Sequence, residues 1–320
     1  MSKVRAILDS FRRQSVSPSL IADMRFEDLA PEDFVRLAYL VLLKRPIDPT
    51  GLAAWNDVVS RGMFSYEYVV SAILKSDEYA AHDTTVANDR LHAARQRWVR
   101  TLPAFGRLLD IGGSSPNRAE GALIQLGYPH RPSTLDILDL PPEQQNWGTP
   151  KYDQSVPTQF DWGTVTYFHG GAETVADVTP LQDKIYDAIF MGQAIEHVRP
   201  EALPSLLDWI RRHLAADGRF IMDTPNRLLT KIQCPTWFIH PDHKLEYEPA
   251  QLERIFAEHG FAVVNRTGLV HLPRIAQSGK FDMREFNDAE LLLHDNVDEC
   301  YLFAFEAAPS SPTYENTSVS

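Results

Sequence analysis

The segment spanning residues 106–128, GRLLDIGGSSPNRAEGALIQLGY, constrains the fold of this chain more than any other. Residues 107–111 are a short apolar run that contains one acid, Asp110, and they predict a buried strand. Four small residues, 112–115, follow, and residues 117–126 then show helical periodicity. A strand, a small-residue turn and a helix open a nucleotide-binding type of α/β unit, because a backbone without Cβ atoms lets a ligand lie against it.

Composition narrows the class of protein. The chain has 320 residues, 44% of them hydrophobic and 23% charged, which fits a globular protein of about two domains. Its 43 acidic residues outnumber 31 Lys and Arg, and the net charge of −12 argues against nucleic acid as a partner. With two cysteines, Cys234 and Cys300, we expect no disulfide framework and a cytoplasmic location. We find no signal-peptide core and no apolar run of about 18 residues, so we expect no transmembrane segment.

The first 25 residues carry a local positive bias. Five basic residues stand against two acids there, and apolar residues recur at helical spacing on one face. Two interpretations stay open: a helix that packs on its neighbour, or peripheral contact with an anionic membrane surface or a membrane-bound partner.

Apolar periodicity, and the breaks in it, divide the rest of the chain. Residues 26–82 alternate helical stripes with Pro and Gly and predict a small all-helical domain, with Ser65 as the N-cap of its third helix. Residues 83–105 predict a connecting helix. Strand-like and helix-like segments alternate over 106–307, which predicts a parallel-rich sheet with helices on both faces. The polar residues 308–320 predict a disordered tail.

The helical domain resembles a known family at the turn LKRPIDPTGLAAW and at the ending SDEY. That family is a small helical domain of unassigned function, often appended to bacterial cell-surface glycan enzymes and distantly similar to phycobilisome-linker repeats. The resemblance implies an interaction module that contacts a protein partner, and not an active site.

A second landmark follows the glycine loop. STLDI, residues 133–137, predicts a strand that ends at Asp136, 24 residues after Gly112. An acid at the end of the second strand is placed to bind both hydroxyls of a ribose. Asp139 competes for this role if the strand runs longer.

Three further segments complete the pattern. Residues 185–198, IYDAIFMGQAIEHV, predict a buried strand, a loop at Gly192 and Gln193, and a helix at Glu196 and His197. A leucine-rich helix and the strand RFIMDTPN follow. The loop FIHPDHKLEYEP, an amphipathic helix and the strand FAVVNR come last.

In this order, LLDIGG, STLDI, YDAIFMGQAIEHV and DGRFIMDTPN resemble the S-adenosylmethionine-dependent methyltransferases of the seven-stranded Rossmann-like class. The resemblance implies an α/β fold with a doubly wound, mostly parallel sheet, here preceded by the small all-helical domain. It also implies S-adenosylmethionine as the cofactor, which leaves as S-adenosylhomocysteine. The EH and TPN pairs place the chain nearest the branch of ubiquinone-pathway and bacterial-glycan O-methyltransferases.

The glycine loop excludes a nicotinamide dehydrogenase. A pyrophosphate requires Gly-x-Gly-x-x-Gly, and the series here is GGSSP. Ser114 and Pro116 also stand where methyltransferases commonly carry further glycines. Serine is small, and proline is favoured in the first turn of a helix, where we place Pro116.

The resemblance assigns cofactor contacts by matching positions. In chain order these are Asp110, Gly112, Gly113 and Ser114 for the methionine moiety, Asp136 for the ribose, the backbone at Ala172 or Glu173 for the adenine amino group, and Gln193 or the backbone around Met191 for the methionine ammonium group.

An acceptor hydroxyl must lose a proton, and histidine is the natural base near neutral pH. We predict His197 and His243 equally for this role, because one follows the cofactor-binding strand and the other lies in the loop over the site. We predict no metal centre. The alternative is a divalent cation on His240, Asp242 and His243 with Glu196.

The sequence therefore predicts an O-methyltransferase that acts on a hydroxyl of a bacterial surface glycan or nucleotide-sugar, with homodimerisation left open. Two alternatives remain: methylation of a small aromatic or quinone-type hydroxyl, and a non-catalytic cofactor-binding or interaction protein. Trp147, Trp162 and Trp237 suit either acceptor, since aromatic rings stack on sugars and on other rings. Residues 272–298 interrupt the final strands and predict an insertion that shapes acceptor specificity.

Overall fold

The computed structural model describes residues 29–43, 45–80, 87–145 and 155–310. The chain divides into two compact units, Met1–Asp83 and Thr84–Ser320, and each is described here by itself. The basic N-terminal segment and Trp147 lie outside the described residues. No helix in the described parts of the chain is long and apolar enough to cross a membrane. The cytoplasmic location stays a prediction.

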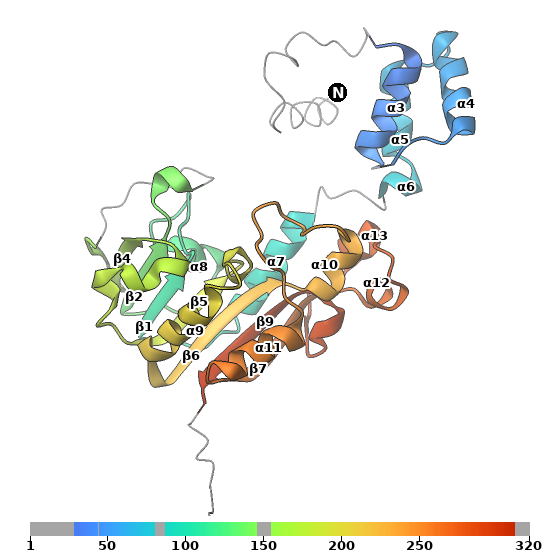
Figure 1. The fold of residues 1–320 in the computed structure, drawn as a ribbon. Helices are drawn as coiled ribbons and strands as arrows, with labels where there is room; N and C mark the ends of the chain where they lie inside the picture. Colours follow the sequence, from blue (N-terminus) through green and yellow to red (C-terminus); the bar gives the residue numbers. More distant parts are fainter. Residues whose placement is uncertain (1–28, 44, 81–86, 146–154, 311–320) are drawn as a thin grey trace, which may run out of the picture. The chain divides into compact units, whose positions relative to one another are not determined.

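The first unit is helical, as predicted (Figure 1). Within its described residues the helices are α3 (Pro31–Leu42), α4 (Pro49–Ser60), α5 (Tyr66–Leu74) and α6 (Asp77–Ala80). Two begin at capping side chains: Asp48 accepts the N–H of Gly51 at 2.8 Å, and Ser65 accepts that of Tyr68 at 3.3 Å. The buried core is Phe34, Val35, Ala38, Leu42, Leu43, Ile47, Leu52, Val59, Val69 and Ile73. This core makes the segment a folded module.

The second unit is built on one sheet (Figure 1). In chain order the strands are β1 (Arg107–Ile111), β2 (Thr134–Asp139), β3 (Thr158–Phe160), β4 (Gly163–His169), β5 (Tyr186–Gly192), β6 (Leu214–Pro225), β7 (Phe261–His271), β8 (Leu293–His294) and β9 (Cys300–Pro309). Their order across the sheet is β3-β4-β2-β1-β5-β6-β9-β7-β8. The five strands from β4 to β6 are parallel, and β9 runs antiparallel between β6 and β7.

The described sheet has nine strands where the resemblance implied seven. The two additional strands are short and lie at the edges. β3 joins β4 through a tight antiparallel hairpin, and β8 comes from the predicted insertion and pairs with β7. The seven inner strands keep the doubly wound, mostly parallel arrangement.

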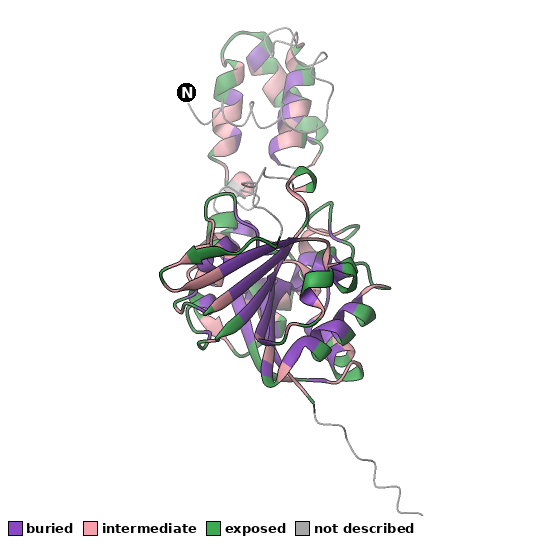
Figure 2. Cartoon of the chain, turned by 90° about the vertical axis from the view of Figure 1, so that its left-hand side faces the viewer, coloured by how far each residue is buried: buried purple, intermediate pink, exposed green. Residues whose placement is uncertain are grey.

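Helices cover both faces of the sheet, as Figure 2 shows by the buried strands between partly exposed helices. One face packs against α7 (Ala87–Val99), α8 (Gly121–Leu126) and α10 (Arg227–Gln233), and the other against α9 (Leu203–His213) and α11 (Pro249–Glu258). Neighbouring residues of one strand serve opposite faces: Leu108 contributes to the first core and Leu109 to the second. The predicted connecting helix is thus part of the second unit.

The insertion between β7 and β9 is ordered. It contains α12 (Pro273–Ser278), α13 (Met283–Asp288), β8 and the short 3-10 helix η6 (Val297–Glu299). Its buried residues Ile275, Met283 and Phe286 extend the core on the α7 face. β9 continues to Pro309, so the predicted tail starts too early; residues 311–320 lie outside the described part of the chain.

Candidate active site

The order of the strands places the candidate site at the carboxyl ends of β1 and β5. After β1 the chain adds β2 and β4 on one side, and it then crosses to add β5 and β6 on the other. Loops that leave β1 and β5 therefore run in opposite directions, and this switch point is the usual ligand position in such sheets. Residues 112–115 follow β1, while Gly192 and Gln193 stand at the end of β5.

The glycine loop depends on two missing side chains. Gly112 has a φ of +78°, which favours glycine, and a Cβ atom there would lie 3.2 Å from the Cβ of Ala194. A Cβ atom on Gly113 would overlap the carboxyl group of Asp110. The backbone N–H of Ser114 donates to the carboxylate of Asp139 at 2.9 Å. The loop therefore offers bare backbone at the end of β1.

The helix after this loop begins later than the periodicity predicts. α8 spans Gly121–Leu126, and residues 117–120 are irregular, with a turn at 119–120. The Oγ of Ser115 accepts the backbone N–H groups of Asn117 and Arg118 at 3.1 Å each, and Gly121, where α8 begins, has a φ of +85°, outside the helical range. Pro116 therefore lies in the loop and not in the first helical turn.

Asp110 is buried beneath the loop. Its Oδ2 accepts the N–H of Leu123 in α8 at 3.3 Å and so ties the strand to the helix. Burial raises the pKa of the Asp110 carboxyl to about 7. This geometry shapes the turn, and the contact of Asp110 with a methionine moiety stays a prediction.

The strand end predicted at Asp136 is wrong. β2 continues to Asp139, and Asp136 lies fully buried in the middle of the strand. Its Oδ2 accepts the ammonium of Lys184 at 2.6 Å and the hydroxyl of Tyr186 at 2.7 Å. Since β5 begins at Tyr186 and runs parallel to β1 and β2, these partners hold Asp136 toward the edge of the sheet opposite the switch point. The acid at the strand end is Asp139, the alternative in the sequence.

Asp139 adjoins the glycine loop. Its carboxylate accepts the N–H groups of Ser114 at 2.9 Å and Leu140 at 2.7 Å. Burial raises the pKa of Asp139, while the hydrogen bond from Ser114 opposes that rise. Gln145 lies beside it and donates from Nε2 to the Ser114 Oγ at 3.2 Å. Among the described residues, the buried Oε1 of Gln145 has no hydrogen-bond partner, so it is an acceptor that a ligand can satisfy.

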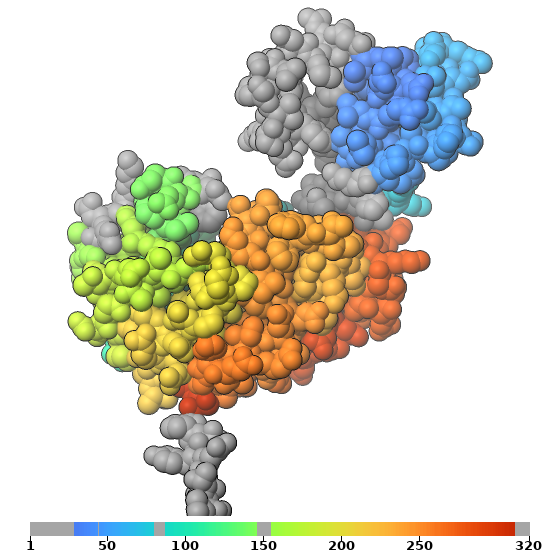
Figure 3. Space-filling view, in the orientation of Figure 1, coloured from blue at the N-terminus to red at the C-terminus, as the bar shows by residue number. Residues whose placement is uncertain are grey.

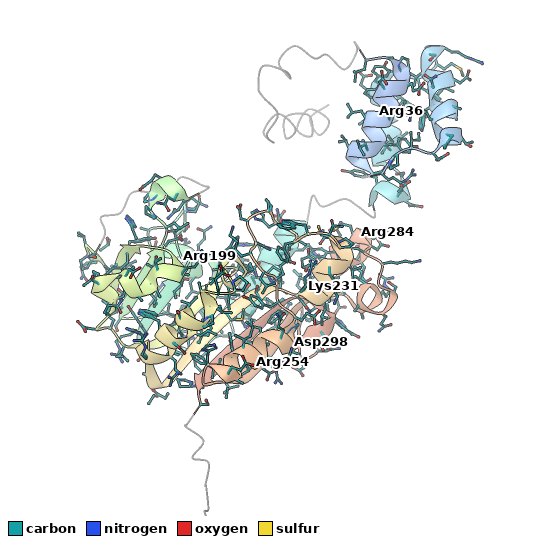
Figure 4. All side chains as sticks on the ribbon, viewed as in Figure 1. Arg36, Arg199, Lys231, Arg254, Arg284 and Asp298 are labelled. Carbon is teal, nitrogen blue, oxygen red and sulfur yellow. The ribbon has the colours of Figure 1, made fainter. Side chains whose placement is uncertain are left out.

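Glu173 is already engaged by an arginine. It lies in the 3-10 helix η3 (Ala172–Asp177) and accepts the backbone N–H and the Nε of Arg199, each at 2.7 Å. The hydrogen bond from Arg199 lowers the pKa of Glu173. Arg199, labelled in Figure 4, follows β5 in the chain, so the pair links the loops after β4 and β5. The adenine contacts predicted for Glu173 and Ala172 stay predictions.

Gln193 belongs to a polar network at the end of β5. It has a φ of +53°, and its Nε2 donates to the Oδ2 of Asp223 at 2.8 Å. Asp223 is fully buried in β6 and also accepts the Nε of Arg95, from α7, at 2.6 Å. Sequence reasoning missed both partners, although an acid inside the apolar strand RFIMDTPN was a signal.

Both predicted bases occupy one cluster. His197 lies in the 3-10 helix η5 (Ile195–His197), where a regular helix start was predicted, and its ring centroid is 4.9 Å from that of His243. The carbonyl of Glu196 accepts the N–H groups of Lys244 at 2.8 Å and Leu245 at 3.2 Å, which holds the second loop against the first. Figure 3 shows these segments, yellow and orange, side by side.

Hydrogen bonds from neighbouring side chains hold two members of this cluster in place. The buried Glu196 accepts the hydroxyl of Thr224 at 2.9 Å, and burial raises its pKa to about 7. His243 is also buried, and its Nδ1 lies 2.7 Å from Oε1 of Glu246. His197 is exposed at the residue level, although burial of its ring lowers its pKa. The sequence did not single out Thr224 or Glu246.

A model of a known protein family matches the part of the chain that forms this site. A family model described as a methyltransferase domain matches residues 79–266, more than half of the chain, so this protein belongs to the methyltransferase domain family. The match confirms the predicted enzyme class and its cofactor, S-adenosylmethionine. A second model, for a domain of unknown function (DUF4214), matches residues 17–82 and confirms the N-terminal domain.

Several solved structures are similar to the chain at low identity. A methyltransferase from Archaeoglobus fulgidus is 17% identical with a TM-score of 0.45, over 69% of this chain and 93% of that one. The N-methyltransferase NodS from Bradyrhizobium japonicum is 13% identical with a TM-score of 0.42, over 72% and 99%. A possible histamine N-methyltransferase from Thermotoga maritima is 14% identical with a TM-score of 0.44, over 70% and 92%. No curated protein matches the chain significantly.

Proposed function

We propose that this methyltransferase transfers a methyl group to a hydroxyl oxygen of a bacterial surface glycan or nucleotide-sugar. The observation that carries the proposal is the pair His197 and His243, which the loops after β5 and α10 bring together at the carboxyl edge of the sheet. When bound, S-adenosylmethionine supplies an electrophilic methyl group. The protein must then orient the acceptor and receive its proton.

Two residues are the best candidates to hold the nucleoside part of the cofactor. Asp139 ends β2, where an acid receives ribose hydroxyls in folds of this type. Gln145 offers a buried acceptor atom that no donor among the described residues reaches, which fits an amino or hydroxyl hydrogen. Gly112 and Gly113 allow close approach to the backbone. These observations transfer the ribose role from Asp136 to Asp139.

The oxygen acceptor is supported by the imidazoles, because methylation of a neutral hydroxyl releases a proton that an imidazole can accept. The glycan class is supported by the sequence resemblance of the helical domain and by Trp237. This residue is 58% exposed and lies in the segment that leads to His243. An exposed indole is a suitable surface for a sugar ring.

Isothermal titration calorimetry with S-adenosylhomocysteine tests the cofactor residues. We expect saturable binding that Asp139→Ala weakens about tenfold or more, since a hydrogen bond to a charged group is lost. Asp187→Asn is the matched control, because Asp187 pairs with Arg107 at the start of the strands. Equal affinity of the Asp139→Ala variant and the native protein would remove Asp139 from the site.

Turnover with a panel of acceptors tests the rest. Release of S-adenosylhomocysteine with sugar nucleotides, but not with catechols or quinols, is the expected result. The reverse preference would assign the aromatic alternative. Tight cofactor binding without turnover on either class would favour the non-catalytic alternative.

A further inference from the structure

We propose that Glu196, His197 and His243 form a binding site for a divalent transition-metal cation. One ligand atom from each residue, a carboxylate oxygen and two imidazole nitrogens, lies within 4.8 Å of the other two. A cation held about 2.0–2.2 Å from each atom in tetrahedral geometry would draw the ligand atoms to about 3.4 Å from one another, so a small movement of the side chains completes the site. Two of the three come from one short segment, and the third comes from the loop bound to it.

The hydrogen bond behind His243 prepares it for this role. An ionised carboxylate can only accept, so the Nδ1 of His243 carries the hydrogen that faces Glu246 at 2.7 Å. In the neutral ring, Nε2 then has a free lone pair. A histidine that donates its other N–H to a carboxylate is the usual arrangement around metal ligands.

Glu246 is itself held by several donors. It accepts the hydroxyl of Thr230 at 2.5 Å and the N–H of Ile239 at 2.8 Å. Its Oε2 also lies 3.4 Å from the Nη1 of Arg227. A buried carboxylate with this many fixed partners holds the His243 ring in one orientation.

Glu196 supplies a second, independent observation. It is 1% exposed and accepts one side-chain hydrogen bond, from Thr224. In the part of the chain that the structure describes, no Lys, Arg or His forms an ion pair with Glu196. Buried carboxylates are normally paired or coordinate metals, and a cation would supply the missing charge.

His197 leaves the site open on one side. It is the exposed member of the three, so a cation here would keep coordination positions for water or substrate. If the proposed methyl transfer is correct, a hydroxyl of the acceptor would occupy one such position. The two histidines would then hold the acceptor hydroxyl through the cation.

The geometry also corrects the metal alternative seen in the sequence. His240 and Asp242, named there as ligands, are not among the three clustered residues. The ring of His240 is 5.3 Å from that of His243, and its Nδ1 accepts the N–H of Asp242 at 3.3 Å. His197 takes the place that the sequence gave to them.

The ligand set selects the metal. Imidazole pairs with one carboxylate suit Zn²⁺, Co²⁺ and related ions, whereas Mg²⁺ and Ca²⁺ prefer oxygen ligands. The test uses full-length protein without a polyhistidine tag, stripped with EDTA and dialysed. CoCl₂ is titrated by calorimetry and by visible absorption, with MgCl₂ in parallel.

We expect one Co²⁺ per chain, with absorption bands of a coordinated ion, and no such affinity for Mg²⁺. His197→Ala, at an exposed position, and Glu196→Gln should each abolish the bands, and Glu246→Gln should weaken binding about 10- to 100-fold. His271→Ala is the matched control, since His271 pairs with Glu299 at 3.1 Å outside the cluster. Near-ultraviolet circular dichroism checks the fold of each variant.

Absence of saturable Co²⁺ binding to the native protein would overturn the proposal. It would also be overturned if His197→Ala and Glu196→Gln bound Co²⁺ as tightly as the native protein. Binding of Mg²⁺ alone would overturn the class of metal. Titration of S-adenosylhomocysteine into the same metal-free protein is a separate measurement. It therefore reports on the cofactor site whatever the cobalt result.

Discussion

The guanidinium of Arg95 donates to both carboxylate oxygens of Asp223, at 2.6 and 3.1 Å, across 128 residues of sequence. Asp223 is fully buried and Arg95 is 17% exposed at its side chain, so the pair is largely withdrawn from water. It ties α7 to the carboxyl end of β6, beside the predicted site residue Gln193.

Removal of the arginine should destabilise the second unit strongly. Arg95→Ala leaves the Asp223 charge buried without its partner, and we expect a loss of about 3–5 kcal/mol in the free energy of unfolding. Urea denaturation followed by tryptophan fluorescence measures it. Arg97→Ala, at an exposed position on the same helix, is the control. The double variant Arg95→Ala/Asp223→Asn should recover part of the loss; no recovery would show that the charge is not the cause.

A methyl group on Gly113 should act through Asp110. Because the added Cβ would overlap the Asp110 carboxyl, we expect Gly113→Ala to cost about 1–3 kcal/mol. Gly171→Ala is the matched control, since its Cβ would meet only atoms at 3.6 Å or beyond. Thermal melting of the two variants compares them. Equal melting temperatures of the two variants would show that the loop has more room at Gly113 than these contacts allow.

Stability should depend on the ionisation of Asp110. Its pKa is raised to about 7 by burial, so the folded protein holds a proton that the unfolded chain releases near pH 4. The Asp110 contribution to stability therefore declines as pH rises from about 4 to 7 and stays low above 7. Asp110→Asn should match the native protein most closely at low pH and exceed it most at pH 8.

The control for this pH profile is Asp187→Asn, for which the expected pH dependence of stability has the opposite sign. Burial alone would raise the pKa of Asp187, but its hydrogen bonds with Arg107 outweigh that effect and lower it. Asp187→Asn should therefore lose stability above the normal carboxyl pKa and approach the native protein as pH falls. Chemical denaturation at several pH values, with all three proteins, separates the trends. Parallel profiles for both variants would contradict the assignment.

Asn226 should be a strong anchor of the insertion. Its Nδ2 donates to the carbonyls of Val297 at 3.0 Å and Cys300 at 2.9 Å, and its Oδ1 caps α10 through the N–H of Leu228. Asn226→Ala leaves several buried carbonyl and N–H groups without their hydrogen-bond partner, and we expect the free energy of unfolding to fall by about 2–4 kcal/mol. Asn265→Ala removes one exposed hydrogen bond and should cost less than about 1 kcal/mol. Calorimetric melting distinguishes the two; similar losses would argue against the anchor.

The sequence predicts well where periodicity carries the information. The buried strand at 188–191 and the leucine-rich helix that became α9 both appear as expected, because a parallel strand is apolar throughout and a surface helix repeats every 3.6 residues. The Ser65 cap is confirmed for a similar reason: its signal is local and chemical.

Other features depend on contacts that no local pattern contains. In LDILD the acids Asp136 and Asp139 lie three residues apart, and only pairing with β1 and β4 fixes where the strand ends. The late start of α8 coincides with Gly121, whose φ of +85° lies outside the helical range and is not marked by the periodicity. His197 and His243 were singled out correctly as residues, but their adjacency follows from backbone bonds between distant loops. The cofactor roles of the predicted residues stay predictions.

β9 follows β7 in the chain yet lies between β6 and β7 in the sheet. While the protein is being synthesised, residues 214–225 and 261–271 leave the ribosome before the strand that joins them. Until residues 300–309 emerge, each presents an open backbone edge that can pair with a neighbouring chain. Nascent chains stalled before residue 300 should therefore be the ones that chaperones need to shield.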